Sequence, residues 1–299
     1  MEHEFGGAWT EEKLDRLRKY LPAYTKIFHK NERAQFLNTV YVDAFAGTGY
    51  ISRRGKKSNE EQGFFEDFAA PEVQNFIQGS AQIALATEPP FDHYVFVEKD
   101  AFRASELERL KVQHRNSGLS IEVVRDDARV FLPTWCSQQN WKKTRAVVFL
   151  DPYANQADWA MLQAVAQGKV DLWLLWPIGQ VINRLLKKNE LPFDSWSDAL
   201  TRAFGTDEWK EKFYSHPSST QLDLFSEEGH IKDEDENLIK VANFKQIEQF
   251  FIERLKLLFD YVAPNPLYLY NSQNTPLYLL CFASHNATGA GIARDILKP

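Results

Sequence analysis

A buried strand that runs directly into a glycine turn is the feature that most constrains this chain. Residues 40–49 read VYVDAFAGTG, which is an apolar run, an acidic residue and then two glycines. Glycine lets the backbone bend sharply and lets a ligand approach closely. A plain turn between a strand and a loop is the alternative interpretation. The acidic strand end favours a ligand site that includes Asp43, Phe45, Gly47 and Gly49.

The spacing of this turn separates the nucleotide ligands that it could hold. A phosphate-binding loop needs G-x-x-x-x-G-K-[ST], and no Lys-Ser or Lys-Thr pair follows at that spacing. A dinucleotide fingerprint needs a third glycine, where this chain has Ser52, and an acidic residue about 20 positions further on. The candidate acid, Glu98, comes much later. Because S-adenosylmethionine has no pyrophosphate to cradle, we predict it as the cofactor.

Apolar runs recur along the chain, and the segments between the later ones are long enough for helices. We predict strands for five runs, which are 39–45, 93–98, 121–125, 146–150 and 171–176. We predict helices at 101–115 and 158–166. Strands that alternate with helices form a parallel sheet. Short apolar runs without polar alternation are typical of strands that are buried on both faces.

The last two apolar runs predict a different kind of pairing. They cover 267–271 and 277–283, and such close spacing suits an antiparallel hairpin. A parallel sheet with a late antiparallel hairpin is associated with class I S-adenosylmethionine-dependent methyltransferases. The predicted fold class is therefore α/β, with a Rossmann-like sheet of this kind.

Helical patterns begin the chain and fill one long segment near its end. The first helix is predicted to have Thr10 as its N-cap and to be bent or interrupted at Pro22. From 180 to 266 the pattern is mainly helical, and its acidic part, 226–237, is expected to be mobile. We predict one methyltransferase domain over 1–299, with the helical insertion as a region that can recognise the substrate.

Acidic residues follow the next two strand ends as well. Glu98 closes the second predicted strand, where its carboxylate can accept hydrogen bonds from both ribose hydroxyls. Asp127 follows the third, where it could meet the amino group of the adenine. Each of these carboxylates alone is more often a solvated strand end. Their placement at successive strand ends, together with Asp43, favours a cofactor site.

The fourth predicted strand ends in the sequence Asp151-Pro152-Tyr153. The Asp151 carboxylate and the Pro152 carbonyl form a pair of acceptors, and Tyr153 offers a flat ring on which a base can stack. These groups can orient an exocyclic amine toward a methyl donor without fully deprotonating it. A simple turn after a strand is the alternative. We predict Asp151, Pro152 and Tyr153 as the catalytic residues.

Four segments together resemble the three-Cys-motif partner protein (TcmP) family, and the resemblance runs nearly from end to end. These segments are 6–10, 43–50, 149–153 and 271–276. The resemblance implies a methyltransferase fold. It also implies association with a separate protein that carries a three-cysteine motif, which this chain lacks.

The chain is also similar, more faintly, to the ribosomal large-subunit adenine-N6 methyltransferases. Residues 79–81 look like their Gly-Ser-Pro cofactor turn, and residues 151–153 look like their Asp-Pro-Pro-Tyr motif with one proline missing. This similarity implies adenine N6 as the methyl acceptor. It implies cofactor contacts from Lys13, Ser80, Glu98, Asp127 and Ala128. For Lys13, an exposed helical lysine is the commoner alternative.

The charge of the chain limits how it can bind nucleic acid. A net charge of −6 argues against a protein that coats nucleic acid non-specifically. A local basic cluster in a predicted surface loop directly follows the glycine turn and suits phosphate contacts; it consists of Arg53, Arg54, Lys56 and Lys57. The pairs 142–143 and 187–188 are expected to be solvated lysines. A methyltransferase acting on protein or a small molecule, or a non-catalytic cofactor-binding subunit, are the alternatives.

The remaining composition indicates the compartment. Cys136 and Cys281 are the only cysteines, and neither has the spacing of a metal ligand. Two buried thiols suit a reducing cytoplasm. The first residues do not resemble a signal peptide. No run approaches the roughly 18 apolar residues of a membrane span. We therefore expect a cytoplasmic protein without a metal.

Overall fold

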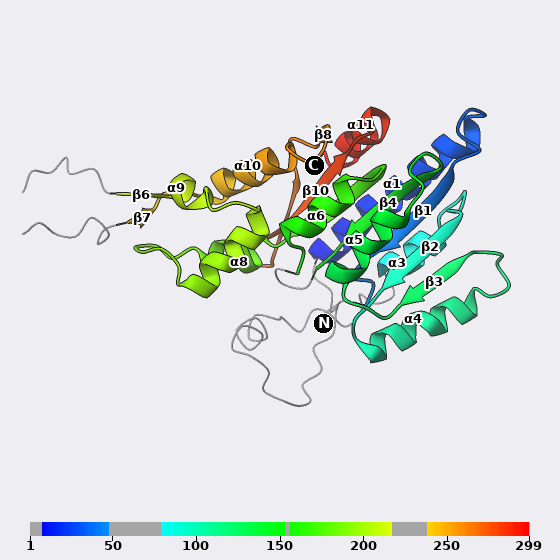
Figure 1. Ribbon diagram of the computed structural model, residues 1–299, viewed down its shortest axis with the longest axis horizontal. Helices are drawn as coiled ribbons and strands as arrows, with labels where there is room; N and C mark the ends of the chain where they lie inside the picture. Colours follow the sequence, from blue (N-terminus) through cyan, green and yellow to red (C-terminus); the bar gives the residue numbers. More distant parts are fainter. Residues whose placement is uncertain (1–7, 48–78, 153–155, 217–237, 299) are drawn as a thin grey trace, which may run out of the picture.

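The computed structural model describes residues 8–47, 79–152, 156–216 and 238–298, and its centre is a large β-sheet (Figure 1). The strands of this sheet are β1 (Asn38–Asp43), β2 (His93–Val97), β3 (Ile121–Val124), β4 (Thr144–Leu150), β5 (Val170–Trp176), β8 (Tyr261–Val262), β9 (Leu267–Tyr270) and β10 (Pro276–Ser284). Their order is β3-β2-β1-β4-β5-β10-β8, and β9 pairs with β10. The predicted strands are all present, with ends that differ by a few residues.

The direction of the strands identifies the fold. The pairs β1–β2, β1–β4, β2–β3 and β4–β5 are parallel. Strand β10 runs antiparallel to β5, β8 and β9, as the predicted hairpin requires. A parallel sheet with one antiparallel strand inserted between its last two strands is the arrangement of the class I S-adenosylmethionine-dependent methyltransferase fold. The predicted fold class is confirmed.

Helices cover both faces of the sheet, so the strands are buried on both sides. One face is covered by α1 (Ala8–Lys30), α3 (Gly79–Leu85), α4 (Ala101–Gln113) and α11 (Ala287–Ile296). The other face is covered by α5 (Ala128–Gln138) and α6 (Trp159–Ala166), which are drawn in green in Figure 1. This double burial explains why the strands of the sequence are continuous apolar runs.

The first helix differs from its prediction in two ways. It already includes Ala8, so Thr10 lies inside the helix and the predicted N-cap is wrong. It also continues through Pro22 to Lys30 without interruption. Burial of Tyr20, Leu21 and Tyr24 against the sheet stabilises the helix on both sides of the proline, which outweighs the hydrogen bond lost there.

The predicted helical insertion extends to one side of the sheet (Figure 1). Its elements are η2 (Ile178–Ile182), α7 (Asn183–Leu185), α8 (Asp194–Phe204), α9 (Trp209–Phe213), the short strands β6 (Tyr214–Ser215) and β7 (Ile239–Lys240), and α10 (Phe244–Leu255). The β6–β7 ribbon is a feature that the sequence did not predict. Trp176 holds the insertion on the sheet, since its ring stacks on Phe251 at 3.9 Å. The acidic segment 226–237 lies outside the described residues.

Two further observations concern the described ranges. Within them, no helix combines the length and the apolar character needed to cross a bilayer, and no group of His, Cys, Asp or Glu is arranged to hold a metal ion. Cys136 and Cys281 are buried and free, and burial raises the pKa of both thiols.

Candidate functional site

The carboxyl ends of three parallel strands meet at the glycine turn. Asp43 at the end of β1 is in register with Phe96 of β2 and Phe149 of β4. Glu98 and Asp151 follow these partners by two positions each. Beyond β1, the Ala44 N–H donates to the Phe149 carbonyl at 3.2 Å, and the Ala46 N–H donates to the Val97 carbonyl at 3.0 Å. The turn therefore lies between the ends of β2 and β4, where open α/β sheets bind ligands.

Asp43 is fully buried and anchors the first part of the site. Its carboxylate accepts a hydrogen bond from the Ser80 hydroxyl at 2.7 Å and one from the Phe45 N–H at 3.3 Å. Burial and the nearby Asp151 carboxylate together raise the pKa of Asp43 to about 7, although these hydrogen bonds and Lys13 act in the opposite direction. Gly79 brings α3 close enough for the Ser80 contact, because a Cβ at Gly79 would lie 2.8 Å from a methyl of Leu14.

Lys13 forms a buried ion pair with Asp151. Its Nζ lies 2.7 Å from Asp151 Oδ2, and the two side chains are 2% and 9% exposed. Burial lowers the pKa of Lys13, although the two carboxylates of Asp151 and Asp43 oppose this shift. Lys13 therefore lies beside Asp151 at the strand ends, and the alternative of an exposed helical lysine is wrong. Two carboxylates and one ammonium meet here in a buried position.

Trp9 is a neighbour of this ion pair that the sequence analysis did not assign to the site. Its ring centroid lies 4.8 Å from Lys13 Nζ and 5.2 Å from the ring of Tyr278 on β10. The four-residue spacing of Trp9 and Lys13, which places them on one face of a helix, was the available signal. The contact with Tyr278 had no such signal, since these residues are far apart in the sequence.

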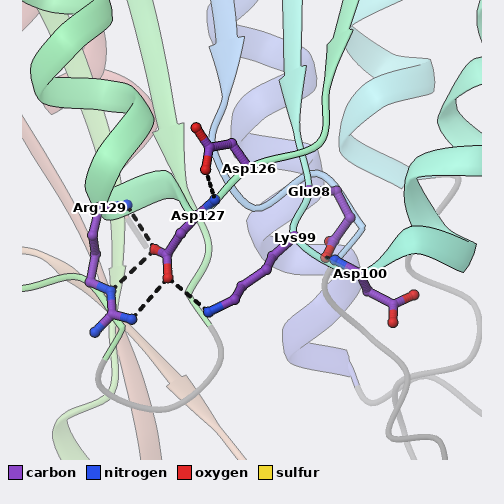
Figure 2. Close-up of polar contacts among 6 residues, drawn as sticks. All are labelled: Glu98, Lys99, Asp100, Asp126, Asp127 and Arg129. Atoms are coloured by element: carbon purple, nitrogen blue, oxygen red, sulfur yellow. Dashed lines mark hydrogen bonds and ion pairs between the residues drawn. The ribbon is translucent and has the colours of Figure 1, made fainter.

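Glu98 carries a buried carboxylate oxygen that is not used. Its Oε1 accepts a hydrogen bond from the Asp100 N–H at 2.7 Å (Figure 2). Its Oε2 is buried and has no hydrogen-bond partner in the described part of the chain. A Cβ at Gly47 would lie 2.5 Å from this oxygen, so only a glycine lets the backbone pass this close to the Glu98 carboxylate. Burial raises the pKa of Glu98. A buried acceptor without a donor is costly, and a ligand hydroxyl would satisfy it.

Asp127 is engaged in contacts within the protein. Figure 2 shows Lys99 and Arg129 pointing at its carboxylate from two sides, with Lys99 Nζ at 3.0 Å and Arg129 Nη2 at 2.9 Å. The same carboxylate caps α5 through the Arg129 N–H. The hydrogen bonds from Arg129 hold the pKa of Asp127 far below its usual value, and Lys99 adds to this. The predicted contact with an adenine amino group stays a prediction and would compete with these donors.

The other predicted residues divide into described and undescribed positions. Phe45 is buried in the core on the α5–α6 side of the sheet. Its backbone N–H donates a hydrogen bond to the Asp43 carboxylate, while its ring packs in the core. Pro152 and Ala128 are also buried. Six predicted positions lie outside the described residues: Gly49, Arg53, Arg54, Lys56, Lys57 and Tyr153.

The raised pKa of Asp43 predicts a pH-dependent stability. Because its folded-state pKa of about 7 exceeds the unfolded value of about 4, ionisation of Asp43 costs free energy as the pH rises through this window. We expect Asp43→Asn to raise the free energy of unfolding by on the order of 2–4 kcal/mol at pH 8 and by much less near pH 4. Denaturant unfolding at a series of pH values measures this difference.

Asp127→Asn is the matched control for this experiment, because the shift of its pKa has the opposite sign. The pKa of Asp127 is depressed in the folded state, so its carboxylate stabilises the protein at neutral pH and loses this effect as the pH falls. Asp127→Asn should therefore destabilise the protein at pH 8. A loss of stability for Asp43→Asn at pH 8 would contradict the assignment of Asp43 as a strained, buried acid.

Comparisons with known proteins give no close relative. No family model and no curated protein matches this chain. Among solved structures, a Legionella pneumophila protein of the family DUF519 aligns over 99% of this chain and 92% of its own at 12% identity, with a TM-score of 0.46. The N-terminal domain of EvdMO1, solved in the presence of SAH and D-fucose, aligns over 96% of this chain and 85% of its own, at 8% identity and with a TM-score of 0.36. Neither similarity is close enough to transfer an activity.

Proposed function

We propose that this chain is an S-adenosylmethionine-dependent methyltransferase. The observation that carries the proposal is the buried Oε2 of Glu98, which has no hydrogen-bond partner among the described residues and lies beside Gly47 at the carboxyl end of β2. In a class I methyltransferase fold, this is the place where an acidic residue can accept the ribose hydroxyls of the cofactor. The close approach of the backbone at Gly47, and an acceptor oxygen without a hydrogen-bond partner among the described residues, fit such a ligand.

The buried charges fit the reacting end of the same cofactor. When bound, S-adenosylmethionine supplies a methyl group on a positively charged sulfur. Lys13, Asp43 and Asp151 together carry a net single negative charge when Asp43 is ionised, and a buried negative charge attracts a cation strongly. The demethylated product lacks this positive charge and gains less from the cluster, which favours its release.

Asp151 orients the methyl acceptor in this proposal. The ion pair with Lys13 fixes its carboxylate in position. Such a carboxylate accepts a hydrogen bond from an amine and directs the lone pair of the nitrogen toward the methyl group. Lys13 therefore acts through Asp151 as a positioning residue.

We propose an exocyclic amine of a nucleic-acid base as the acceptor, with adenine N6 favoured. The acceptor pair of Asp151 and Pro152, followed by Tyr153, supports this choice, because amine orientation and base stacking are then provided by adjacent residues. Phosphate contacts from the loop that holds Arg53 to Lys57 belong to the same proposal. Association with a three-Cys-motif partner protein, which the sequence resemblance implies, is also proposed.

Cofactor binding and nucleoside analysis test the proposal in two stages. S-Adenosylmethionine at 100 times its Kd is expected to stabilise the protein by about 2.7 kcal/mol, while NAD should have no effect. Mass spectrometry of nucleosides, from cells with and without this protein, should then show loss of one methylated base. Tighter binding of NAD would overturn the cofactor assignment.

A methyl-transfer assay on the purified chain, with and without the three-Cys-motif partner, separates a catalyst from a binding subunit. Methyl transfer by the purified chain alone supports catalysis, and transfer only with the three-Cys-motif partner makes the partner essential. If the cofactor binds but the set of methylated nucleosides is unchanged, the methyl acceptor is instead a protein or a small molecule.

A further inference from the structure

The insertion brings together lysines that are distant in the sequence. The Lys240 N–H of β7 donates to the Lys188 carbonyl at 2.7 Å, and the Tyr214 hydroxyl of β6 donates to the Lys187 carbonyl at 2.9 Å. The segment from Lys187 onward therefore runs beside the β6–β7 ribbon. The pair 187–188, expected from the sequence to be an ordinary solvated surface, acquires a third lysine from β7.

This part of the surface carries a small excess of cations in a chain that is acidic as a whole. Residues 183–198 and 238–241 hold four Lys or Arg side chains and three carboxylates, which are Glu190, Asp194 and Asp198, whereas the net charge of the chain is −6. Burial lowers the pKa of Lys240, and the nearby Lys188 cation lowers it further. A bound anion would relieve this repulsion. Glu190 pairs with Lys187, but it is 66% exposed, and such surface pairs are weak competitors.

An exposed aromatic ring lies against these lysines. Phe193 is 55% exposed, and its ring centroid lies 3.5 Å from Lys187 Nζ. Trp196 contacts the same ring edge-on at a centroid distance of 4.8 Å, which holds it in place. A fixed, exposed ring beside cations is the combination on which single-stranded bases stack while their phosphates pair with lysine.

The position of this surface relates it to the proposed active site. Helix η2 begins two residues after the end of β5, and α7 follows η2 directly. Strand β5 is parallel to β4, so its carboxyl end lies at the same edge of the sheet as Asp151. Lys187 and Lys188 therefore follow a short, buried connection from that edge.

We infer that Lys187, Lys188, Phe193 and Lys240 form a binding surface for single-stranded nucleic acid, with phosphates on the lysines and a base on Phe193. The inference rests on the proposed function in taking nucleic acid as the substrate class. The lysines favour an anionic ligand over an apolar protein segment. The exposed Phe193 ring in contact with Lys187 favours a nucleic acid over an acidic protein segment, because such a ring can stack on any base.

Binding of fluorescently labelled oligothymidine and oligouridine tests this surface. The double variant Lys187→Gln/Lys188→Gln should lower the slope of log K against log salt concentration by about 1.4, as the loss of two phosphate contacts to a single strand requires. Phe193→Ala should weaken binding about tenfold. Matched controls are Lys142→Gln/Lys143→Gln, an exposed lysine pair elsewhere, and Phe102→Ala, whose ring is 65% exposed on α4.

The controls should bind as the wild type does, and all variants should keep the wild-type affinity for S-adenosylmethionine. Equal weakening by the two lysine pairs would overturn the inference, because it would show a general charge effect. So would wild-type binding by Phe193→Ala, or an absence of oligonucleotide binding at low salt. If S-adenosylmethionine does not bind the wild type in calorimetry, the proposed function is overturned instead. Oligonucleotide binding is measured without cofactor, so that the two results are independent.

Discussion

Asp151→Ala is expected to lower the rate of methyl transfer by about 10²–10³-fold, the usual cost of losing one well-placed polar group at a reacting centre. The structure adds a second effect that the sequence did not predict. Removing Asp151 leaves Lys13 buried without its partner at 2.7 Å, and breaking a buried pair costs about 3–5 kcal/mol of stability. The rate must therefore be measured on protein whose folded fraction is known from thermal denaturation.

A conservative variant separates these two effects. Asp151→Asn keeps an oxygen that can accept a hydrogen bond from the amine, but it cannot neutralise Lys13. We expect it to be destabilised like Asp151→Ala while retaining more of the activity. The double variant Lys13→Met/Asp151→Leu should regain stability without activity, because apolar residues can replace a buried pair. Near-normal turnover by Asp151→Ala on an identified substrate would remove Asp151 from the reaction.

Glu98→Ala is expected to weaken S-adenosylmethionine binding by roughly ten- to a hundredfold. Hydrogen bonds to a charged group contribute about 1.5–3 kcal/mol, and the proposed acceptor of the ribose hydroxyls would be lost. The apo protein should not be destabilised in proportion, since one oxygen of this buried carboxylate has no partner among the described residues. Isothermal titration calorimetry measures the affinity, and denaturant unfolding without cofactor measures the stability.

Two comparisons make this result specific. Glu98→Gln keeps one acceptor oxygen without its charge, so its affinity should fall between those of the wild type and Glu98→Ala. Glu122→Ala removes an exposed carboxylate from the neighbouring strand β3 and should bind the cofactor normally. If Glu98→Ala binds as tightly as the wild type, Glu98 does not contact the ribose, and the observation that carries the proposed function loses its meaning.

The strands and their approximate ends could be predicted because burial on both faces leaves a direct trace in the sequence. Runs such as 146–150 and 171–176 are apolar without alternation, and the structure places them in the centre of the sheet. The hairpin of β9 and β10 was predictable for a similar reason, since its two runs are close in the chain. The first helix was less predictable at Thr10 and Pro22, because packing on the sheet outweighed local preferences.

The strand-end acids were predicted together, but the structure shows that they are not equivalent. Within the described ranges, one buried oxygen of Glu98 has no hydrogen-bond partner, whereas Asp127 is paired with Lys99 and Arg129. Both have a similar local sequence signal, an acid at or shortly after the end of an apolar run. The difference arises from which cations neighbouring segments place beside each carboxylate, and local sequence does not encode that arrangement in a readable form.

The sequence alone predicts the α/β class, the parallel sheet with its late hairpin, and the position of the glycine turn at a strand end. These features depend on burial and backbone geometry over a few neighbouring residues. The side chains that meet at the turn could be identified only from the folded chain. Lys13 pairs with Asp151 across 138 positions of the sequence. The Lys240 N–H donates to the Lys188 carbonyl, although α8, α9 and β6 lie between these two residues in the sequence. Electrostatic energies depend on the distances between charges and on their removal from water, and both are set only when the chain has folded.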